Sequence, residues 1–222
     1  MAGDLLEALE VETAPSPRAA VLWMHGLGAD GYDFVDLVPA LGLGATPVRF
    51  VFPHAPMRPV TINRGMAMRA WYDVRDDVGT RREDASGVRE SQARIEALIA
   101  REKSRGIAAD RVVLAGFSQG GAMALHTGLR HPERLAGIMA LSCYLPLADH
   151  FPGEATAANR ATPIFMAHGT HDPLIPLDRA RQARDTLARL GYRVEWHEYP
   201  MPHSVCDAEV VHIAEWLARI LA

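Results

Sequence analysis

The sequence contains very little cysteine: Cys143 and Cys206 are the only two among 222 residues. Two cysteines cannot build the disulfide framework that stabilises small secreted proteins. We therefore interpret both as reduced thiols inside the protein. The first residues, M-A-G-D-L-L-E, carry acids where a signal peptide has a basic region, so the sequence predicts a cytoplasmic location.

Long apolar runs and an excess of basic residues are also missing. No run approaches the ~18 apolar residues of a membrane-spanning helix, so we expect no membrane insertion. The chain has 23 Lys and Arg against 27 Asp and Glu, a net charge of -4, and the two signs are interspersed. This charge pattern argues against nucleic acid as a partner. The ten histidines show no metal-site grouping, and we predict no metal and no cofactor.

No repeat, low-complexity tract or linker divides the chain, so we expect residues 1–222 to form a single domain. Hydrophobic residues make up 49% of the sequence, enough for one substantial core. Apolar runs predict buried strands at 19–24, 48–52, 112–115, 135–141 and 163–167, and alternating polar and apolar residues predict a half-exposed edge strand at 192–199. Helical spacing predicts helices at 32–41, 84–105, 177–190 and 209–221, with another after Ser118. Strands that alternate with helices indicate an α/β fold with a mainly parallel, doubly wound sheet flanked by helices.

Ser118 is the candidate nucleophile. It lies in G-F-S-Q-G, residues 116–120, between the predicted strand at 112–115 and a helix. In α/β-hydrolases the G-x-S-x-G pattern forms a strained nucleophile elbow, whose glycines leave room for the serine. The pattern by itself also fits an ordinary turn, so the interpretation depends on whether the chain supplies an acid and a base.

Asp172 and His203 are the candidate acid and base. Catalytic triads of this fold follow the chain order Ser, Asp or Glu, His, with each residue after a different strand. Asp172 and His203 both meet this condition. The weaker candidates lie in connections, within elements or beside Asp172: Asp149, Glu154, Asp178, His171, His197 and His212. In this hypothesis Ser118 attacks an acyl carbonyl, His203 moves its proton, and Asp172 orients the imidazole.

The glycine-rich loop at 25–31 directly follows the first predicted buried strand. Such a loop supplies one oxyanion-hole N–H in many esterases, although it also fits a plain turn. We predict that the backbone N–H groups of Leu27 and Gln119 hold the oxyanion.

Residues 53–73 combine three prolines with large apolar side chains and predict a long irregular segment. These side chains either line an acyl pocket or cap the core. Our candidates for substrate binding are Phe117, Met66, Met68 and Trp71. Only about 20 residues lie between 142 and 162, too few for a large lid domain.

Five motifs in order resemble the phospholipase/carboxylesterase family, which includes acyl-protein thioesterases, lysophospholipases and small bacterial carboxylesterases. They are H-G-L-G-A-D-G at 25–31, A-W-Y-D at 70–73, G-F-S-Q-G-G-A-M at 116–123, H-G-T-H-D-P at 168–173 and P-M-P-H-S-V at 200–205. The resemblance spans nearly the whole chain. It implies an α/β-hydrolase without a lid, a Ser118, Asp172, His203 triad, and oxyanion donors at Leu27 and Gln119.

Two positions depart from the family's pattern. Pro202 stands where family members often carry a glycine before the histidine, so the loop that bears His203 is expected to be stiffer or differently placed. The loop after Leu27 is one residue longer than the H-G-L-G-D form of the animal thioesterases. Asp30 therefore does not inherit the role of their aspartate.

The sequence thus predicts a serine hydrolase that cleaves carboxylic esters, and thioesters as a further possibility, through an acyl-enzyme. Its substrates would be small-molecule or lipid acyl esters or acylated proteins, and the resemblance makes a homodimer plausible. The alternatives are a lysophospholipase or peptidase with the same triad, or a non-catalytic binding protein of the hydrolase fold.

Overall fold

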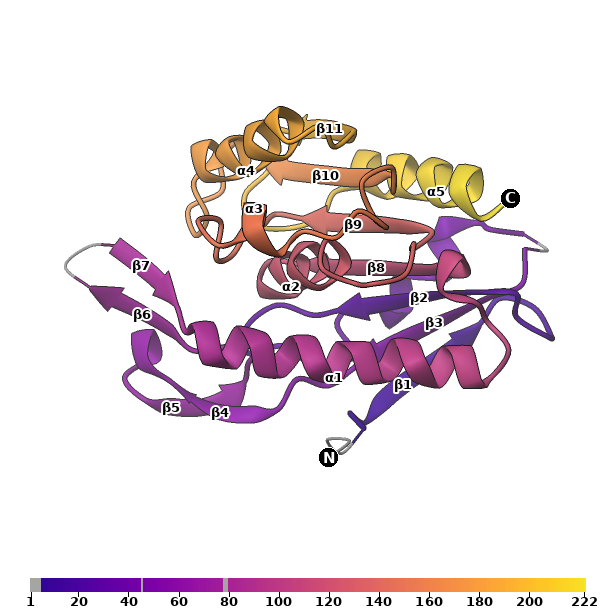
Figure 1. The fold of residues 1–222 in the computed structure, drawn as a ribbon, viewed down its shortest axis with the longest axis horizontal. Helices are drawn as coiled ribbons and strands as arrows, with labels where there is room; N and C mark the ends of the chain where they lie inside the picture. The colour runs from indigo at the N-terminus through magenta and orange to yellow at the C-terminus, as the bar shows by residue number, and fades with distance from the viewer. Residues whose placement is uncertain (1–4, 45, 78–79) are drawn as a thin grey trace.

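A seven-stranded sheet forms the centre of the computed structural model, which describes residues 5–44, 46–77 and 80–222 (Figure 1). In spatial order its strands are β1 (Ala8–Glu12), β3 (Val48–Pro53), β2 (Ala19–Met24), β8 (Val112–Phe117), β9 (Gly137–Leu141), β10 (Ile164–Gly169) and β11 (Val194–Tyr199). Only β1 runs antiparallel to its neighbour, β3, and all the other pairs are parallel. The predicted α/β-hydrolase sheet is therefore confirmed.

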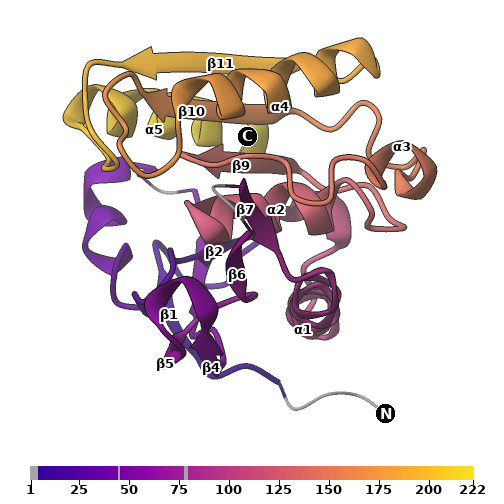
Figure 2. The same cartoon turned by 90° about the vertical axis from the view of Figure 1, so that its left-hand side faces the viewer.

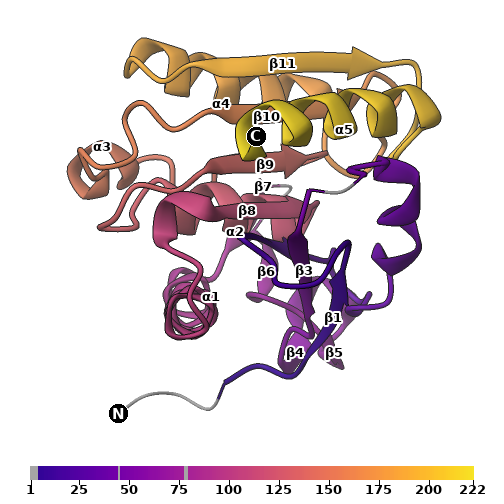
Figure 3. The ribbon, with the colours of Figure 1, turned by 90° about the vertical axis from the view of Figure 1, so that its right-hand side faces the viewer.

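Helices cover both faces of this sheet. One face packs against α1 (Ala85–Ser104), α2 (Gln119–Gly128), α3 (Phe151–Glu154) and α4 (Leu177–Arg189). The other packs against α5 (Asp207–Leu221) and two short 3-10 helices, η1 (Val35–Leu37) and η2 (Pro39–Leu41). Figures 2 and 3 show α1 and the two 3-10 helices on opposite sides of the sheet. The strands covered on both faces are buried along their length, as central parallel strands should be.

The long helix α1 lies within the predicted range 84–105. Its N-cap is Asp84, whose carboxylate accepts the backbone N–H groups of Ser86 and Gly87. Its buried stripe includes Val88, Ile95 and Ile99. The apolar stripe predicts this helix from the sequence, and the cap explains why it begins at this position.

The prediction of an α-helix at 32–41 is wrong. The chain forms η1 and η2 there instead of one α-helix. Pro39 begins η2, and a proline inside an α-helix removes a hydrogen bond and clashes with the preceding turn. Val38 and Leu41 are still buried in the core. The apolar spacing therefore predicted which residues are buried but not the type of helix that they form.

The segment at 53–73 is more regular than predicted. It contains an antiparallel hairpin of β4 (Met57–Val60) and β5 (Met66–Arg69), joined through the 3-10 turn η3 (Thr61–Asn63). A second hairpin follows, formed by β6 (Val74–Asp77) and β7 (Thr80–Glu83), and it extends away from the sheet next to the start of α1 (Figure 1).

No lid domain covers the carboxyl ends of the strands in the described ranges, since the chain between β9 and β10 carries only the short α3. Among the helices of the described residues, none combines the length and apolarity that a bilayer span requires. In a parallel sheet, ligand sites form outside the carboxyl ends of the strands. The candidate residues after β2, β8, β10 and β11 are therefore all at one edge of the sheet.

Candidate active site

Ser118 forms a strained turn between β8 and α2. Its φ of 55° and ψ of -119° are rare for a residue with a side chain. The glycines on both sides make the turn possible. A Cβ on Gly116 would lie 2.3 Å from the carbonyl carbon of Gly120, and a Cβ on Gly120 would lie 2.2 Å from the carbonyl oxygen of Met24. The backbone N–H of Ser118 donates to the carbonyl oxygen of Leu141 at 2.8 Å, which ties the turn to β9.

Asp172 and His203 are brought together from loops that follow β10 and β11. His203 Nδ1 lies 2.6 Å from Asp172 Oδ2. The side chain of Asp172 is fully buried, and its other oxygen accepts the backbone N–H groups of Leu174 at 2.8 Å and Ile175 at 2.9 Å. A carboxylate held in this way accepts a hydrogen bond from Nδ1–H, so Nε2 is left as the basic atom of the imidazole. His203 and Ser118 line the same cavity.

His168 is a site residue to which the sequence analysis assigned no role. It is fully buried at the end of β10, where its Nε2 donates to the carbonyl oxygen of Ile175 at 2.8 Å and lies 3.3 Å from Asp172 Oδ2. Burial lowers the pKa of His168, so the ring is neutral. A histidine four residues before the acid, at the end of the same strand, was the signal available in the sequence.

The two predicted oxyanion donors belong to two different segments next to Ser118. Gln119 is the first residue of α2, where backbone N–H groups have no partner within the helix. Leu27 lies in the loop after β2, and this loop packs on the elbow: a Cβ on Gly26 would be 3.4 Å from Ser118 Cβ. Leu27 and Gln119 line the cavity together with Ser118 and His203.

This cavity has a volume of about 390 Å³, within the range of small-molecule sites. Its apolar wall consists of Leu27, Ala29, Ile62, Val74, Phe117, Leu174 and Ile175. The ring of Phe117 lies against that of His203, with centroids 4.7 Å apart. The cavity surface is mostly apolar, although Asp33, Asn63 and Arg179 also line it beside Ser118 and His203.

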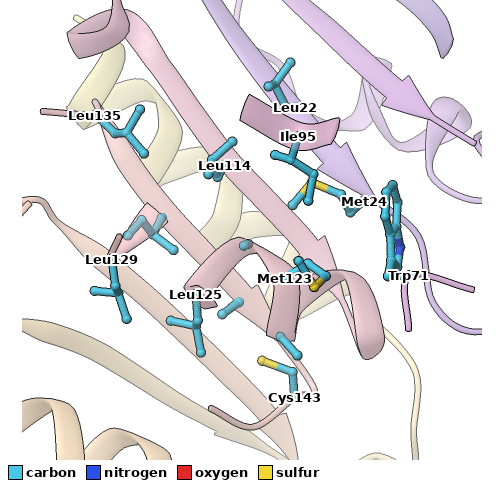
Figure 4. Close-up of a cluster of buried hydrophobic side chains, with 14 of the residues drawn as sticks. Leu22, Met24, Trp71, Ile95, Leu114, Met123, Leu125, Leu129, Leu135 and Cys143 are labelled. Carbon is cyan, nitrogen blue, oxygen red and sulfur yellow. The ribbon is translucent and has the colours of Figure 1, made fainter. Parts of the chain in front are cut away.

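Of the four residues predicted to bind substrate, Phe117 lines this cavity. The structure corrects the prediction for Met66, Met68 and Trp71, which do not line it. Trp71 is fully buried in the core, close to Met24 and Met123 (Figure 4). Met66 is 65% exposed on the β4–β5 hairpin, and Met68 packs against the loop at Gly28. Composition singled out this segment, but Met66 points to solvent, and Met68 lies beside Asn63 and the Gly28 loop without lining the cavity itself.

None of the rival acids and bases lines the cavity that contains Ser118. Glu154 pairs with Arg89 and Arg130. The side chain of Asp178 is 84% exposed, and Asp149 and His171 are exposed as well. His197 and His212 stack on each other, with ring centroids 4.6 Å apart, and neither lines the cavity that contains Ser118.

The comparisons with known proteins agree with this architecture. The family model described as Phospholipase/Carboxylesterase matches residues 7–221. Acyl-protein thioesterase 1 of Neurospora crassa is 42% identical over 213 residues, which cover 91% of this chain and 87% of that protein. Acyl-protein thioesterase 1 of Gibberella zeae is 37% identical over 231 residues, which cover 100% of this chain and 98% of that protein.

Solved structures show the same fold. The crystal structure of Arabidopsis thaliana SOBER1 superposes with a TM-score of 0.84 at 31% identity, and the match covers 92% of this chain and 100% of that one. Zea mays acyl-protein thioesterase 2 gives a TM-score of 0.84 at 25% identity, covering 97% of this chain and 99% of that one.

Proposed function

Because the chain belongs to the phospholipase/carboxylesterase family, we propose that it hydrolyses carboxylic ester and thioester bonds of acyl substrates with Ser118 as the nucleophile. The observation that carries the proposal is the 2.6 Å contact between His203 Nδ1 and Asp172 Oδ2, in a cavity shared with a serine in a strained elbow. The names of the thioesterase relatives support the bond type.

The first half of the reaction forms an acyl-enzyme. Ser118 Oγ attacks the acyl carbonyl while His203 Nε2 accepts the hydroxyl proton. Asp172 keeps the imidazole in the required tautomer and stabilises the imidazolium. The N–H groups of Leu27 and Gln119 receive the negative charge that develops on the carbonyl oxygen. His203 then protonates the alcohol or thiol that leaves, and Ser118 retains the acyl group.

The second half returns the serine. A water molecule attacks the acyl-enzyme and gives a proton to His203, the oxyanion forms again, and the carboxylic acid is released as Ser118 regains its proton. Apart from the attacking water, the proposed reaction uses only Ser118, His203, Asp172 and two backbone N–H groups. We propose acyl lipids or acylated proteins as the substrate class because the cavity wall beside Ser118 is mostly apolar. A homodimer and a cytoplasmic location stay predictions from the sequence.

Replacing Ser118 tests the mechanism. We expect Ser118→Ala to lower kcat by about 10⁴-fold or more and to abolish covalent labelling by a fluorophosphonate, since the attacking oxygen is gone. The matched control is Ser142→Ala, which removes the hydroxyl of a fully buried serine at the end of β9 that does not line the cavity. Full esterase activity in Ser118→Ala, or unchanged labelling, would refute the mechanism.

The acyl pocket is tested by chain length. We expect kcat/KM for p-nitrophenyl esters to rise from acetate to an optimum, because each CH₂ buried in the transition state contributes up to ~0.8 kcal/mol. Phe117→Ala should flatten the rise, since it removes an apolar wall beside His203. A series that is flat in the unmodified protein would contradict an acyl pocket and favour small soluble esters.

A further inference from the structure

The two predicted oxyanion donors come from distant parts of the chain, and one short segment binds the residues on both sides of Gly26 and Leu27 as well as the side chain of Gln119. Residues 69–72 start at the last residue of β5 and make hydrogen bonds both to the Leu27 loop and to the first residue of α2. On the loop side, the indole Nε1–H of Trp71 donates to the carbonyl oxygen of His25 at 2.9 Å. The carbonyl oxygen of Arg69 accepts the N–H of Gly28 at 2.9 Å. The loop is therefore held immediately before and immediately after Gly26 and Leu27.

The same segment holds the start of α2 through the side chain of Gln119. The Oε1 atom of Gln119 accepts the backbone N–H of Trp71 at 2.7 Å, and its Nε2 donates to the carbonyl oxygen of Tyr72 at 2.8 Å. Gln119 is only 4% exposed, so both hydrogen bonds are shielded from water. The amide thus binds the backbone of residues 71 and 72 at two points.

The segment is itself anchored in the core, so it can hold the Leu27 loop and the start of α2 at a fixed separation. Trp71 is fully buried among the apolar side chains drawn in Figure 4, and its carbonyl oxygen accepts the hydroxyl of Ser91 from α1. On the loop side, His25 Nε2 accepts the N–H of Ala55 at 3.0 Å, which leaves Nδ1–H to donate to the carbonyl oxygen of Gly26 at 2.6 Å. Burial lowers the pKa of His25 to about 4, so the ring is neutral and can make this pair of bonds.

We propose that Trp71 and the side chain of Gln119 are positioning residues that set the separation of the Leu27 and Gln119 N–H groups. Neither side chain contacts the reacting atoms in this assignment. They act by holding two donors at the spacing that the oxyanion requires. Such preorganisation matters because the donors stabilise the transition state more than the substrate, and a displacement of about 1 Å is costly. The inference rests on the proposed hydrolase function.

Two variants test it, and neither changes a predicted donor. Trp71→Phe keeps an aromatic ring in the core and removes the hydrogen bond to the His25 carbonyl. Gln119→Ala keeps the backbone N–H and removes both bonds to residues 71 and 72. For each we expect kcat to fall about 10-fold or more while KM stays within about 2-fold, since only transition-state stabilisation is lost.

A second readout separates positioning from loss of fold. A trifluoromethyl ketone of matched acyl length forms a tetrahedral adduct with the serine, and its Ki should rise by the same factor as kcat/KM falls. The control is Trp196→Phe on β11, which also removes an indole hydrogen bond, here to Glu198 Oε1 at 2.9 Å. It should change neither quantity. Thermal melting of each variant establishes the temperature at which all are folded for the comparison.

The outcomes distinguish this inference from the proposed function. If Ser118→Ala is inactive while Trp71→Phe and Gln119→Ala retain kcat and the ketone's Ki, the positioning role is wrong and the hydrolase mechanism stands. A rise in KM at constant kcat would also overturn it, because it would indicate a role in substrate binding. If Ser118→Ala keeps its activity, the mechanism itself fails.

Discussion

At the scale of single residues, the site depends on backbone geometry that a few small residues permit. Gly120 has no room for a side chain, because the atoms around its missing Cβ are carbonyl groups of Met24 and His25 rather than flexible side chains. These two residues join β2 to the Leu27 loop. Any widening at Gly120 would therefore move the predicted oxyanion loop away from Ser118.

Gly120→Ala tests this close packing. A Cβ placed 2.2 Å from the Met24 carbonyl oxygen forces the backbones apart, so we expect a loss of about 1–3 kcal/mol in unfolding free energy and a large fall in kcat/KM. The matched control is Gly153→Ala, where an added Cβ would have no atom within 4 Å. Urea unfolding and ester hydrolysis measure both effects. Equal behaviour of the two variants would contradict the packing argument.

At the scale of elements, a buried charge cluster joins the edge of the sheet to α1. Arg49 on β3 contacts Glu102 on α1 at 2.7 Å and Glu12 on β1 at 2.9 Å. The side chain of Glu102 is fully buried and that of Arg49 is 9% exposed. Removing Glu102 takes a buried carboxylate away from Arg49 and also from Arg101 and Arg105, which lie 3.0 and 3.1 Å from it, while Glu12 still contacts Arg49. Breaking a buried pair from one side costs more free energy than the intact pair contributes.

We therefore expect Glu102→Ala to lower the unfolding free energy by about 3–5 kcal/mol, measured by urea denaturation. The double variant Arg49→Met, Glu102→Leu should recover much of this loss, because it removes both charges and fills the volume. Glu90→Ala, which breaks an exposed i,i+4 pair with Arg94 on the same helix, should cost about 0.5 kcal/mol or less. A double variant less stable than Glu102→Ala would show that the charges themselves are needed.

At the scale of the whole molecule, buried titratable groups on different elements give the fold opposing responses to pH. Burial lowers the pKa of His126 to about 3. For this histidine the unfolded chain binds more protons, so its contribution is complete above its ordinary pKa of about 6.5 and is lost as pH falls below that value. Glu209 behaves in the opposite way, because burial raises its pKa to about 8 and its contribution is lost as pH rises from about 4.5 to 8.

Two variants make this opposition measurable. When the pH is lowered from 7 to 5, His126→Gln should gain about 2 kcal/mol in unfolding free energy relative to the unmodified protein. The reason is that the variant lacks the histidine that is protonated in the unfolded chain but stays neutral when buried. Over the same interval Glu209→Gln should lose about 2.5 kcal/mol in unfolding free energy relative to the unmodified protein, because the variant lacks the buried carboxyl whose protonation favours the folded state. Urea denaturation at both pH values gives these differences. Parallel pH profiles for all three proteins would contradict the assignment.

The sequence by itself determined the elements whose pattern arises locally. The buried strand at 19–24 and the long helix within 84–105 were readable because burial on both faces and an amphipathic stripe are written into neighbouring residues. The glycines around Ser118 predicted the elbow for the same reason. Strand order along the chain also placed Asp172 and His203 at one edge, since parallel strands end together.

Only the tertiary structure decided how the distant parts meet. In the structure Met66 is exposed to solvent and Trp71 is buried in the core, although the composition of their segment is typical of a pocket. It also assigned hydrogen bonds to His168, Trp71 and the Gln119 amide, whose partners lie on other elements. The physical reason is that side-chain direction and long-range pairing depend on where the sheet and hairpins place the backbone. The spacing of residues along the chain does not predict that placement.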